Sequence, residues 1–166
     1  MATLVLVRHA KSDYPAGVVD HDRPLSPRGR ANAATIAPRI REAIPADTSL
    51  GAAISTAVRA SQTWSIVAPG LPAIAQEWSD AALYLAEPSA IAEVATCFTT
   101  DVGIIVGHNP GIEELARAVP ASRDAVARQM ADKFPTAAFA VIDTGATPLA
   151  AWQPEDSTCT DFVTCR

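Results

Sequence analysis

Two arginines and two histidines have side chains suited to binding and transferring a phosphoryl group: Arg8, Arg59, His9 and His108. Arginine stays charged at any working pH, and its planar guanidinium binds two phosphate oxygens at once. Histidine, with an unperturbed pKa of about 6.5, can be a neutral nucleophile or a protonated donor at physiological pH. The formal net charge is −5, so a cluster of cations needs a local reason. Together these residue types predict an oxyanion site, for which phosphate is the most common ligand.

The spacing places these residues near the ends of predicted strands. Three short apolar stretches predict buried strands, at residues 4–7, 51–54 and 102–106. Arg8 and His9 directly follow the first stretch, and His108 follows the third after one glycine. Arg59 lies about one helical turn beyond the end of the second stretch. Because ligands bind outside the carboxyl ends of the strands in open parallel sheets, we expect these side chains to meet at one sheet edge.

Apolar strands alternate with helical segments along the chain. Helices are predicted at residues 26–44, 58–67, 88–98, 112–119 and 123–133. Further strands are predicted at residues 73–76, 137–142 and 149–152. This alternation predicts an α/β fold, a three-layer sandwich whose mostly parallel central sheet carries helices on both faces.

The composition predicts one globular domain. The chain has 166 residues, of which 49% are hydrophobic and 19% charged. We expect the domain to span residues 1–153 and to be followed by a loosely ordered tail, residues 154–166, rich in Ser, Thr and Asp. Cys159 and Cys165 lie in that tail, where they could pair, although two free thiols are the simpler expectation. Cys97 lies in an apolar helical pattern and is expected in the core.

Several classes of partner are disfavoured. The acidic net charge argues against a bulk electrostatic interaction with nucleic acid or an anionic membrane. No stretch approaches transmembrane length, and the apolar start is too short for a signal sequence, so we expect a soluble cytoplasmic protein. No His, Asp or Glu group has metal-ligand spacing, so no metal or other cofactor is expected. The oligomeric state is left open.

Three motifs resemble those of the histidine phosphatase superfamily. They are Leu-Val-Arg-His-Ala at 6–10, Ser-Thr-Ala-Val-Arg-Ala-Ser-Gln-Thr at 55–63 and Val-Gly-His-Asn-Pro-Gly at 106–111. Their order and spacing fit as well, so the resemblance covers nearly the whole chain and implies a phosphoglycerate mutase-like fold. The short length, residues 8–12, and Asp-Arg-Pro-Leu at 22–25 are most similar to the small SixA-type phosphohistidine phosphatases.

This resemblance implies a role for each site residue. His9 is expected to be the nucleophile that takes the phosphoryl group. Arg8 and Arg59 would hold its oxygens, and His108 would donate a hydrogen bond to it. The implied mechanism is two in-line displacements through a phosphohistidine intermediate, the second by water.

The loop before the first long helix leaves one role open. Arg23 either reaches the phosphate pocket or is a surface arginine that pairs with Asp20 or Asp22. His21, between those aspartates, is expected to be solvated.

The general acid is unassigned. Many superfamily members place a clear carboxylate after the second motif, whereas residues 83–86 here are Leu-Tyr-Leu-Ala. Glu87 and Asp80 are nearby but do not align. An alkoxide leaving group needs a proton from such an acid, whereas the imidazole of phosphohistidine can leave already protonated. The gap therefore favours a substrate with a P–N bond.

Three functions remain after this reasoning. The leading one is a phosphatase that dephosphorylates phosphohistidine in proteins. The alternative is a small-molecule phosphatase acting on a sugar, glycerate or nucleotide phosphate. A non-catalytic phosphate-binding module is less consistent with the sequence, because binding alone would not require a nucleophile at His9. The expected partner is accordingly a phosphorylated protein or a small phosphorylated metabolite.

Overall fold

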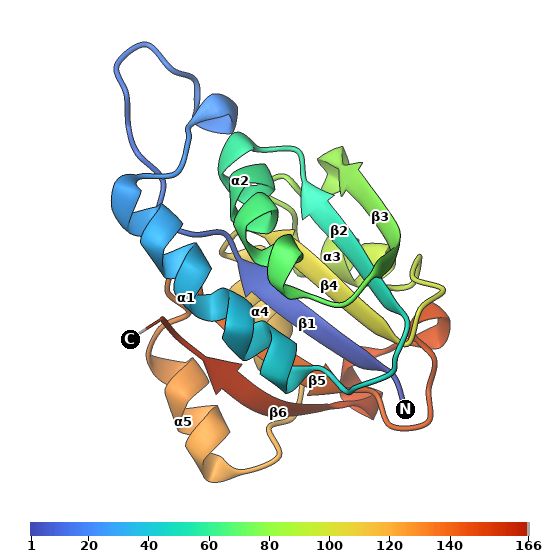
Figure 1. Cartoon of the computed structure of the whole chain (residues 1–166). Coiled ribbons are helices and arrows are strands. Elements are labelled where there is room, and N and C mark those ends of the chain that lie inside the picture. Colours follow the sequence, from blue (N-terminus) through green and yellow to red (C-terminus); the bar gives the residue numbers. More distant parts are fainter. Residues whose placement is uncertain (166) are drawn as a thin grey trace.

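A six-stranded sheet lies at the centre of the computed structural model, which describes residues 1–165 of the chain (Figure 1). The strands are β1 (Thr3–Arg8), β2 (Leu50–Ser55), β3 (Ile74–Asp80), β4 (Val102–Gly107), β5 (Phe139–Asp143) and β6 (Thr158–Val163). Their order in the sheet is β3-β2-β4-β1-β5-β6. The first four strands pair in parallel, and β5 and β6 are antiparallel to their neighbours. The predicted α/β fold with a mostly parallel sheet is confirmed.

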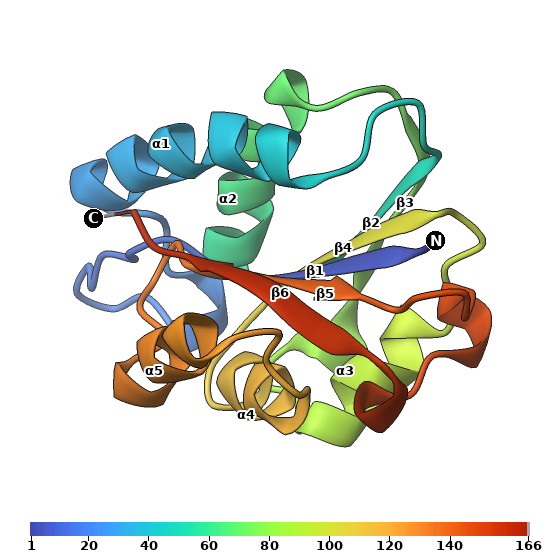
Figure 2. The same cartoon turned by 90° about the horizontal axis from the view of Figure 1, so that it is seen from below.

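Helices cover both faces of this sheet (Figure 2). They are α1 (Pro27–Ala43), α2 (Val58–Val67), α3 (Pro88–Ala95), α4 (Gly111–Ala118) and α5 (Asp124–Asp132). Helices α1 and α2 lie on one face, and α3, α4 and α5 lie on the other. Strand β1 serves both faces because successive side chains of a strand point in opposite directions. Leu4 and Leu6 pack into the core under α3 and α4, whereas Val5 and Val7 pack into the core under α1 and α2.

The start of α1 positions the loop that follows β1. Ser26 caps the helix, since its Oγ accepts the N–H of Gly29 at 3.0 Å, and Pro27 takes the first helical position. A Cβ atom on Gly29 would lie only 1.9 Å from the carbonyl oxygen of Lys11. The missing side chain therefore lets the segment just after His9 lie directly against the helix.

The C-terminal residues are not the loosely ordered tail that we expected. Residues 158–163 form the edge strand β6, which pairs with β5 and belongs to the same sheet as the rest of the chain. Cys159 and Phe162 are buried, so the strand has one apolar face. A register shift between Val141 and Ile142 breaks the two-residue alternation by which the sequence would have indicated a strand. The predicted tail is wrong for the described residues, and Arg166 lies outside them.

Two smaller predictions also differ. Residues 149–152 do not form a strand: Leu149–Ala151 is a short 3-10 helix that begins after Pro148. Cys97 is exposed and not in the core, and all three cysteines are free. No helix among residues 1–165 has both the length and the apolar character needed to cross a bilayer.

Candidate active site

Strand ends bring the predicted site residues together at one edge of the sheet. β1 and β4 are parallel neighbours, with Arg8 opposite Gly107, so His9 and His108 emerge side by side. Their ring centroids are 4.9 Å apart. Helix α2 begins just after β2 and directs Arg59 into the same place, where its Nε donates to Nε2 of His9 at 3.2 Å. The expectation that these side chains converge is therefore met by the geometry.

His9 is held in one tautomer. Its Nδ1 lies 2.7 Å from the carbonyl oxygen of Ala10, and because a carbonyl can only accept, Nδ1 carries the ring hydrogen. Nε2 is then the unprotonated nitrogen, which agrees with its accepting a hydrogen bond from Arg59. Burial, together with His108, Arg59 and Arg8, lowers the pKa of His9 to about 3, and the hydrogen bond to the Ala10 carbonyl opposes this shift. The side chain is thus a neutral imidazole with a lone pair on Nε2.

Thr63 links the loop that follows His9 to α2. Its Oγ accepts the N–H of Ala10 at 2.9 Å and donates to the carbonyl oxygen of Arg59 at 2.7 Å. Thr63 is fully buried, so both bonds are shielded from water. This side chain fixes the distance between the segment that holds His9 and the helical turn that holds Arg59.

His108 has one ring nitrogen bonded and one without a partner. Nε2 lies 2.7 Å from Oγ of Ser55, which also accepts the N–H of Ala57. When Ser55 donates to Nε2, the ring hydrogen is on Nδ1, and that buried atom has no partner among the described residues. Burial lowers the pKa of His108 to about 4, helped by Arg59 and opposed by Asp20. A neutral His108 can therefore offer one N–H to a ligand.

Arg8 is also incompletely bonded. Its Nη1 donates to the carbonyl oxygen of Phe134 at 2.7 Å, which anchors the side chain. Its Nε is buried and, among residues 1–165, has no partner. Unpaired buried donors are costly unless a ligand accepts from them. Arg8 Nε and His108 Nδ1 thus suit an oxyanion with several acceptor oxygens.

The sequence reasoning missed the part that Asp20 plays beside this cluster. Asp20 begins a short 3-10 helix (Asp20–Asp22), and its carbonyl oxygen and Oδ2 accept from Nη1 and Nη2 of Arg59, at 2.6 and 3.0 Å. Tyr84 donates its hydroxyl to the same Oδ2 at 2.6 Å. The Tyr84 hydroxyl, together with Arg23 and Arg59, holds the pKa of Asp20 well below its usual range. Asp20 is therefore an ionised carboxylate that forms an ion pair with the guanidinium of Arg59.

Arg23 lies at the rim, and of the two alternatives the structure shows the ion pair. Its Nη1 donates to Oδ1 of Asp20 at 2.8 Å, and its Nε donates to the carbonyl oxygen of Asp13 at 2.9 Å. The guanidinium carbon lies 3.5 Å from the centre of the Tyr14 ring, a cation–π contact. Arg23 is therefore connected to Arg59 through the shared carboxylate of Asp20.

His21 is not simply solvated, contrary to expectation. Its Nε2 lies 2.9 Å from Oγ1 of Thr56, and its Nδ1 lies 3.1 Å from the carboxylate of Asp22. The ring stands edge-on to Tyr84, which in turn stands edge-on to His108. His21 and Tyr84 thus form an aromatic wall beside the cluster of His9, His108 and Arg59. Neither a periodicity nor a motif in the sequence indicated this wall.

Neither of the two suggested general acids is bonded to the cluster. Asp80 accepts from the N–H of Ala82 and from Nε1 of Trp78, so both its oxygens are already bonded. The described hydrogen bonds and ion pairs do not involve the side chain of Glu87, which is exposed. The carboxylate that does reach the pocket belongs to Asp20, and it is ionised.

A metal site would need several ligands close together. Among residues 1–165, no group of three or more His, Cys, Asp or Glu side chains is arranged to hold a metal ion. The side chains gathered at this sheet edge are the arginine and imidazole donors around the neutral imidazole of His9.

Comparison with known proteins agrees with this geometry. The family model described as "Histidine phosphatase superfamily (branch 1)" matches residues 4–82. An uncharacterized protein of Mycobacterium tuberculosis is 37% identical over 141 residues, which cover 82% of this chain and 85% of that protein.

Two solved structures are similar over nearly the whole chain. The putative phosphohistidine phosphatase SixA from Nakamurella multipartitia has a TM-score of 0.81 at 25% identity, covering 98% of this chain and 95% of that one. The putative phosphohistidine phosphatase SixA from Agrobacterium tumefaciens has a TM-score of 0.78 at 26% identity, covering 98% of this chain and 97% of that one. These likenesses support a phosphatase activity. On its sequence and its fold, the chain belongs to the histidine phosphatase superfamily.

Proposed function

We propose that this protein is a metal-independent phosphatase that dephosphorylates phosphohistidine in proteins, with His9 as the nucleophile. The observation that carries the proposal is the state of His9: a buried neutral imidazole whose unprotonated Nε2 faces the guanidinium of Arg59. A nucleophile needs that lone pair unprotonated at physiological pH, and the low pKa of His9 keeps it so.

In the first step, Nε2 of His9 attacks the phosphorus atom in line with the leaving nitrogen. A bond forms between His9 Nε2 and phosphorus, and the bond from phosphorus to the substrate imidazole breaks with its electron pair going to that nitrogen. Arg8, Arg59 and His108 donate to the phosphoryl oxygens, where negative charge gathers in the transition state. Two atoms of these residues, Arg8 Nε and His108 Nδ1, are buried without a partner among residues 1–165 and would supply such donors, His108 when Ser55 donates to its Nε2.

In the second step, a water molecule replaces the nitrogen on phosphorus. The water oxygen bonds to phosphorus, and the electron pair of the P–N bond returns to Nε2 of His9. The proton lost by the water goes to a phosphate oxygen, and inorganic phosphate leaves. His9 is then restored to the neutral tautomer that its bond to Ala10 maintains.

The ionised state of Asp20 favours a P–N substrate over an ester. Its carboxylate is held by Tyr84, Arg23 and Arg59, so it has no proton to give to a departing alkoxide. Such a proton is worth about a hundredfold to ten-thousandfold in rate for a poor leaving group. The imidazole of phosphohistidine needs no proton from the enzyme if its second nitrogen is already protonated.

A substrate panel tests the proposal. We expect kcat/KM to be highest for a phosphohistidine peptide, measurable for an aryl phosphate and lowest for sugar, glycerate and nucleotide phosphates. A large preference for one of those alkyl phosphates would indicate that the substrate is a phosphorylated metabolite and not a phosphoprotein. Absence of turnover with every compound, including the aryl phosphate, would contradict enzymatic activity altogether.

A further inference from the structure

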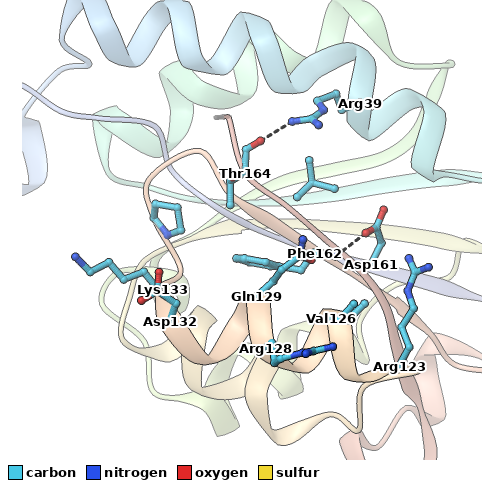
Figure 3. Close-up of a pocket in the computed structure, with 13 residues that line it drawn as sticks. Arg39, Arg123, Val126, Arg128, Gln129, Asp132, Lys133, Asp161, Phe162 and Thr164 are labelled. Carbon is cyan, nitrogen blue, oxygen red and sulfur yellow. Dashed lines mark hydrogen bonds between the residues drawn. The ribbon is translucent and has the colours of Figure 1, made fainter.

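A groove with an excess of positive charge lies beside the edge strand β6 (Figure 3). Its volume is about 860 Å³, and residues of α1, α5 and β6 line it together with the segments that flank α5 and β6. The charged side chains in its lining are Arg39, Arg123, Arg128 and Lys133 against Asp132 and Asp161. We call this hollow the basic groove. It is separate from the His9 pocket and takes no part in the chemistry proposed above.

The four cations of the basic groove have no carboxylate partners among residues 1–165, where the ion pairs involve other arginines and a histidine. Arg39 donates to the carbonyl oxygen of Thr164, and Arg128 donates to that of Asp124. All four are exposed. In a chain with a formal net charge of −5, unpaired cations gathered in one hollow favour an anionic occupant.

The end of the basic groove at Val163 lies at the same sheet edge as His9. β5 is antiparallel to both of its neighbours, so β6 runs parallel to β1. Phe139 pairs with Val7 on one side and with Val163 on the other. Two strand spacings therefore separate Val163 from Val7, which is about 10 Å. A chain lying in the groove along β6 thus ends near His9.

One segment forms a wall shared by the groove and the pocket. Lys133 and Pro135 line the groove, while the carbonyl oxygen of Phe134 between them accepts from Nη1 of Arg8 at 2.7 Å. The N–H of Ala137 donates to the carbonyl oxygen of His9 at 3.1 Å. A ligand that contacts Lys133 therefore lies next to the segment that holds Arg8 at the proposed phosphate site.

A second hollow continues the positive charge toward the pocket. It has a volume of about 220 Å³, shares Pro135 with the basic groove and includes Lys11 and Arg28. Lys11 comes two residues after His9. Cationic side chains thus extend from the far end of α5 to the mouth of the catalytic site.

We propose that the basic groove binds an acidic segment of the phosphoprotein substrate, flanking the phosphorylated side chain that enters the His9 pocket. This inference rests on the proposed function. The nine residues of α5 span about 14 Å, and the offset from β1 to β6 adds about 10 Å. An extended segment of about seven residues covers that path. Asp or Glu residues within about seven positions of the phosphohistidine should therefore improve binding.

A peptide suits this groove better than a single-stranded nucleic acid does. Proteins that bind single strands stack the bases on accessible aromatic side chains. The aromatic residue in the lining of the basic groove is Phe162, and it is buried. Single-stranded RNA is therefore the competing occupant that the experiment must exclude.

The first arm of the test measures binding without phosphorylation. A fluorescein-labelled peptide of about ten residues, rich in Glu and containing one His, is titrated with the wild type and compared with a Gln-for-Glu version. We expect the acidic peptide to bind at least about tenfold more tightly, with an affinity that falls as salt is added. The variant Arg128→Glu/Lys133→Glu should bind the Glu peptide and the Gln peptide with equal affinity. The control Arg30→Glu/Arg41→Glu has the same charge change on exposed residues of α1 outside the groove and should keep the tighter binding of the Glu peptide.

The second arm measures kcat/KM for the same two peptides carrying phosphohistidine, with an aryl phosphate as a reference. We expect a lower KM for the acidic peptide, lost in Arg128→Glu/Lys133→Glu, while aryl phosphate turnover stays at the wild-type rate. Equal KM values and equal binding for both peptides would overturn the groove proposal and leave the phosphatase intact. Tight binding of the acidic peptide without its hydrolysis would support the groove and contradict the phosphohistidine substrate. An RNA oligomer of equal length that displaces the acidic peptide would overturn the peptide as occupant.

Discussion

Oδ2 of Asp20 lies 3.0 Å from Nη2 of Arg59, on the guanidinium that we assign to the phosphoryl group. The main-chain oxygen of Asp20 accepts from Nη1 of the same arginine at 2.6 Å. Each outer nitrogen of Arg59 thus uses one of its two N–H groups on Asp20 before any anion binds. An incoming phosphoryl group must share this guanidinium with the negatively charged Asp20 carboxylate, so Asp20 competes with the substrate for the positive charge of Arg59.

Replacing Asp20 by Asn should therefore tighten anion binding. The substitution keeps the size of the side chain and removes its charge, which frees Arg59 and ends the repulsion of an incoming anion. We expect tungstate, a phosphate analogue, to bind about fivefold more tightly to Asp20→Asn than to the wild type. Isothermal titration calorimetry measures this. Asp22→Asn is the matched control, since Asp22 contacts His21 and not Arg59. Equal tungstate affinity in Asp20→Asn and the wild type would show that Asp20 does not compete.

Replacing His9 by Ala should abolish turnover and leave the fold intact. His9 is the proposed nucleophile, and removal of a covalent nucleophile costs about a thousandfold or more in kcat. In the wild type, rapid acid-free quenching should trap phosphate that is stable to base and labile to acid. His21→Ala is the comparison, because His21 lies at the rim and makes no bond to the proposed phosphate donors. Turnover by His9→Ala within tenfold of the wild type would exclude the mechanism.

Arg59 should matter more for anion affinity than Arg23 does. Arg59 is buried and contacts His9 directly, whereas Arg23 reaches the site only through Asp20. A charge-assisted hydrogen bond inside a protein is worth about 1.5 to 3 kcal/mol, so Arg59→Ala should weaken tungstate binding by roughly tenfold to a hundredfold. Arg23→Ala should change it much less. Calorimetry on both variants decides the order, and the reverse order would assign Arg23 to the phosphate.

The four central site residues could be predicted because strands and one helix position them. Arg8 ends β1, and His9 and His108 directly follow the adjacent parallel strands β1 and β4, so their convergence needs only the order of the strands in the sheet. Arg59 lies in the first turn of α2, whose start after β2 the sequence also indicated. Motifs on regular elements keep their geometry, and sequence spacing was therefore enough.

The residues that were missed lie on irregular segments. Asp20 and Tyr84 meet across 64 positions of sequence, and each belongs to a loop with only a short 3-10 helix. No two-residue or helical periodicity exists there to indicate which side chains face the pocket. Strand β6 was missed for a related reason, because its bulge disturbs the alternation of buried and exposed residues.

Stability should fall as the solution is acidified below the ordinary pKa of histidine. In the folded protein the pKa of His9 is lowered to about 3 and that of His108 to about 4, from 6.5 in both cases. Between those values the unfolded chain binds protons that the folded chain does not, so falling pH lowers the free energy of the unfolded state relative to the folded state. The stability is fully present above pH 6.5 and is lost progressively down to the folded pKa values. At a pH of about 5 the loss is about 2 kcal/mol for each histidine.

Urea unfolding at several pH values measures this dependence. The wild type should lose unfolding free energy between about pH 7 and pH 5, and His108→Gln should lose about 2 kcal/mol less over the same interval. His9→Gln should behave in the same way, since its pKa is lowered by the same principal cause, burial. The comparison uses the change in unfolding free energy with pH within each variant. The loss of the hydrogen bond between His108 and Ser55 lowers the stability of His108→Gln equally at every pH and therefore does not affect the comparison. If both variants lose as much stability as the wild type, the two imidazoles are not buried in the neutral form, and His9 would not have the unprotonated lone pair that the proposed mechanism requires.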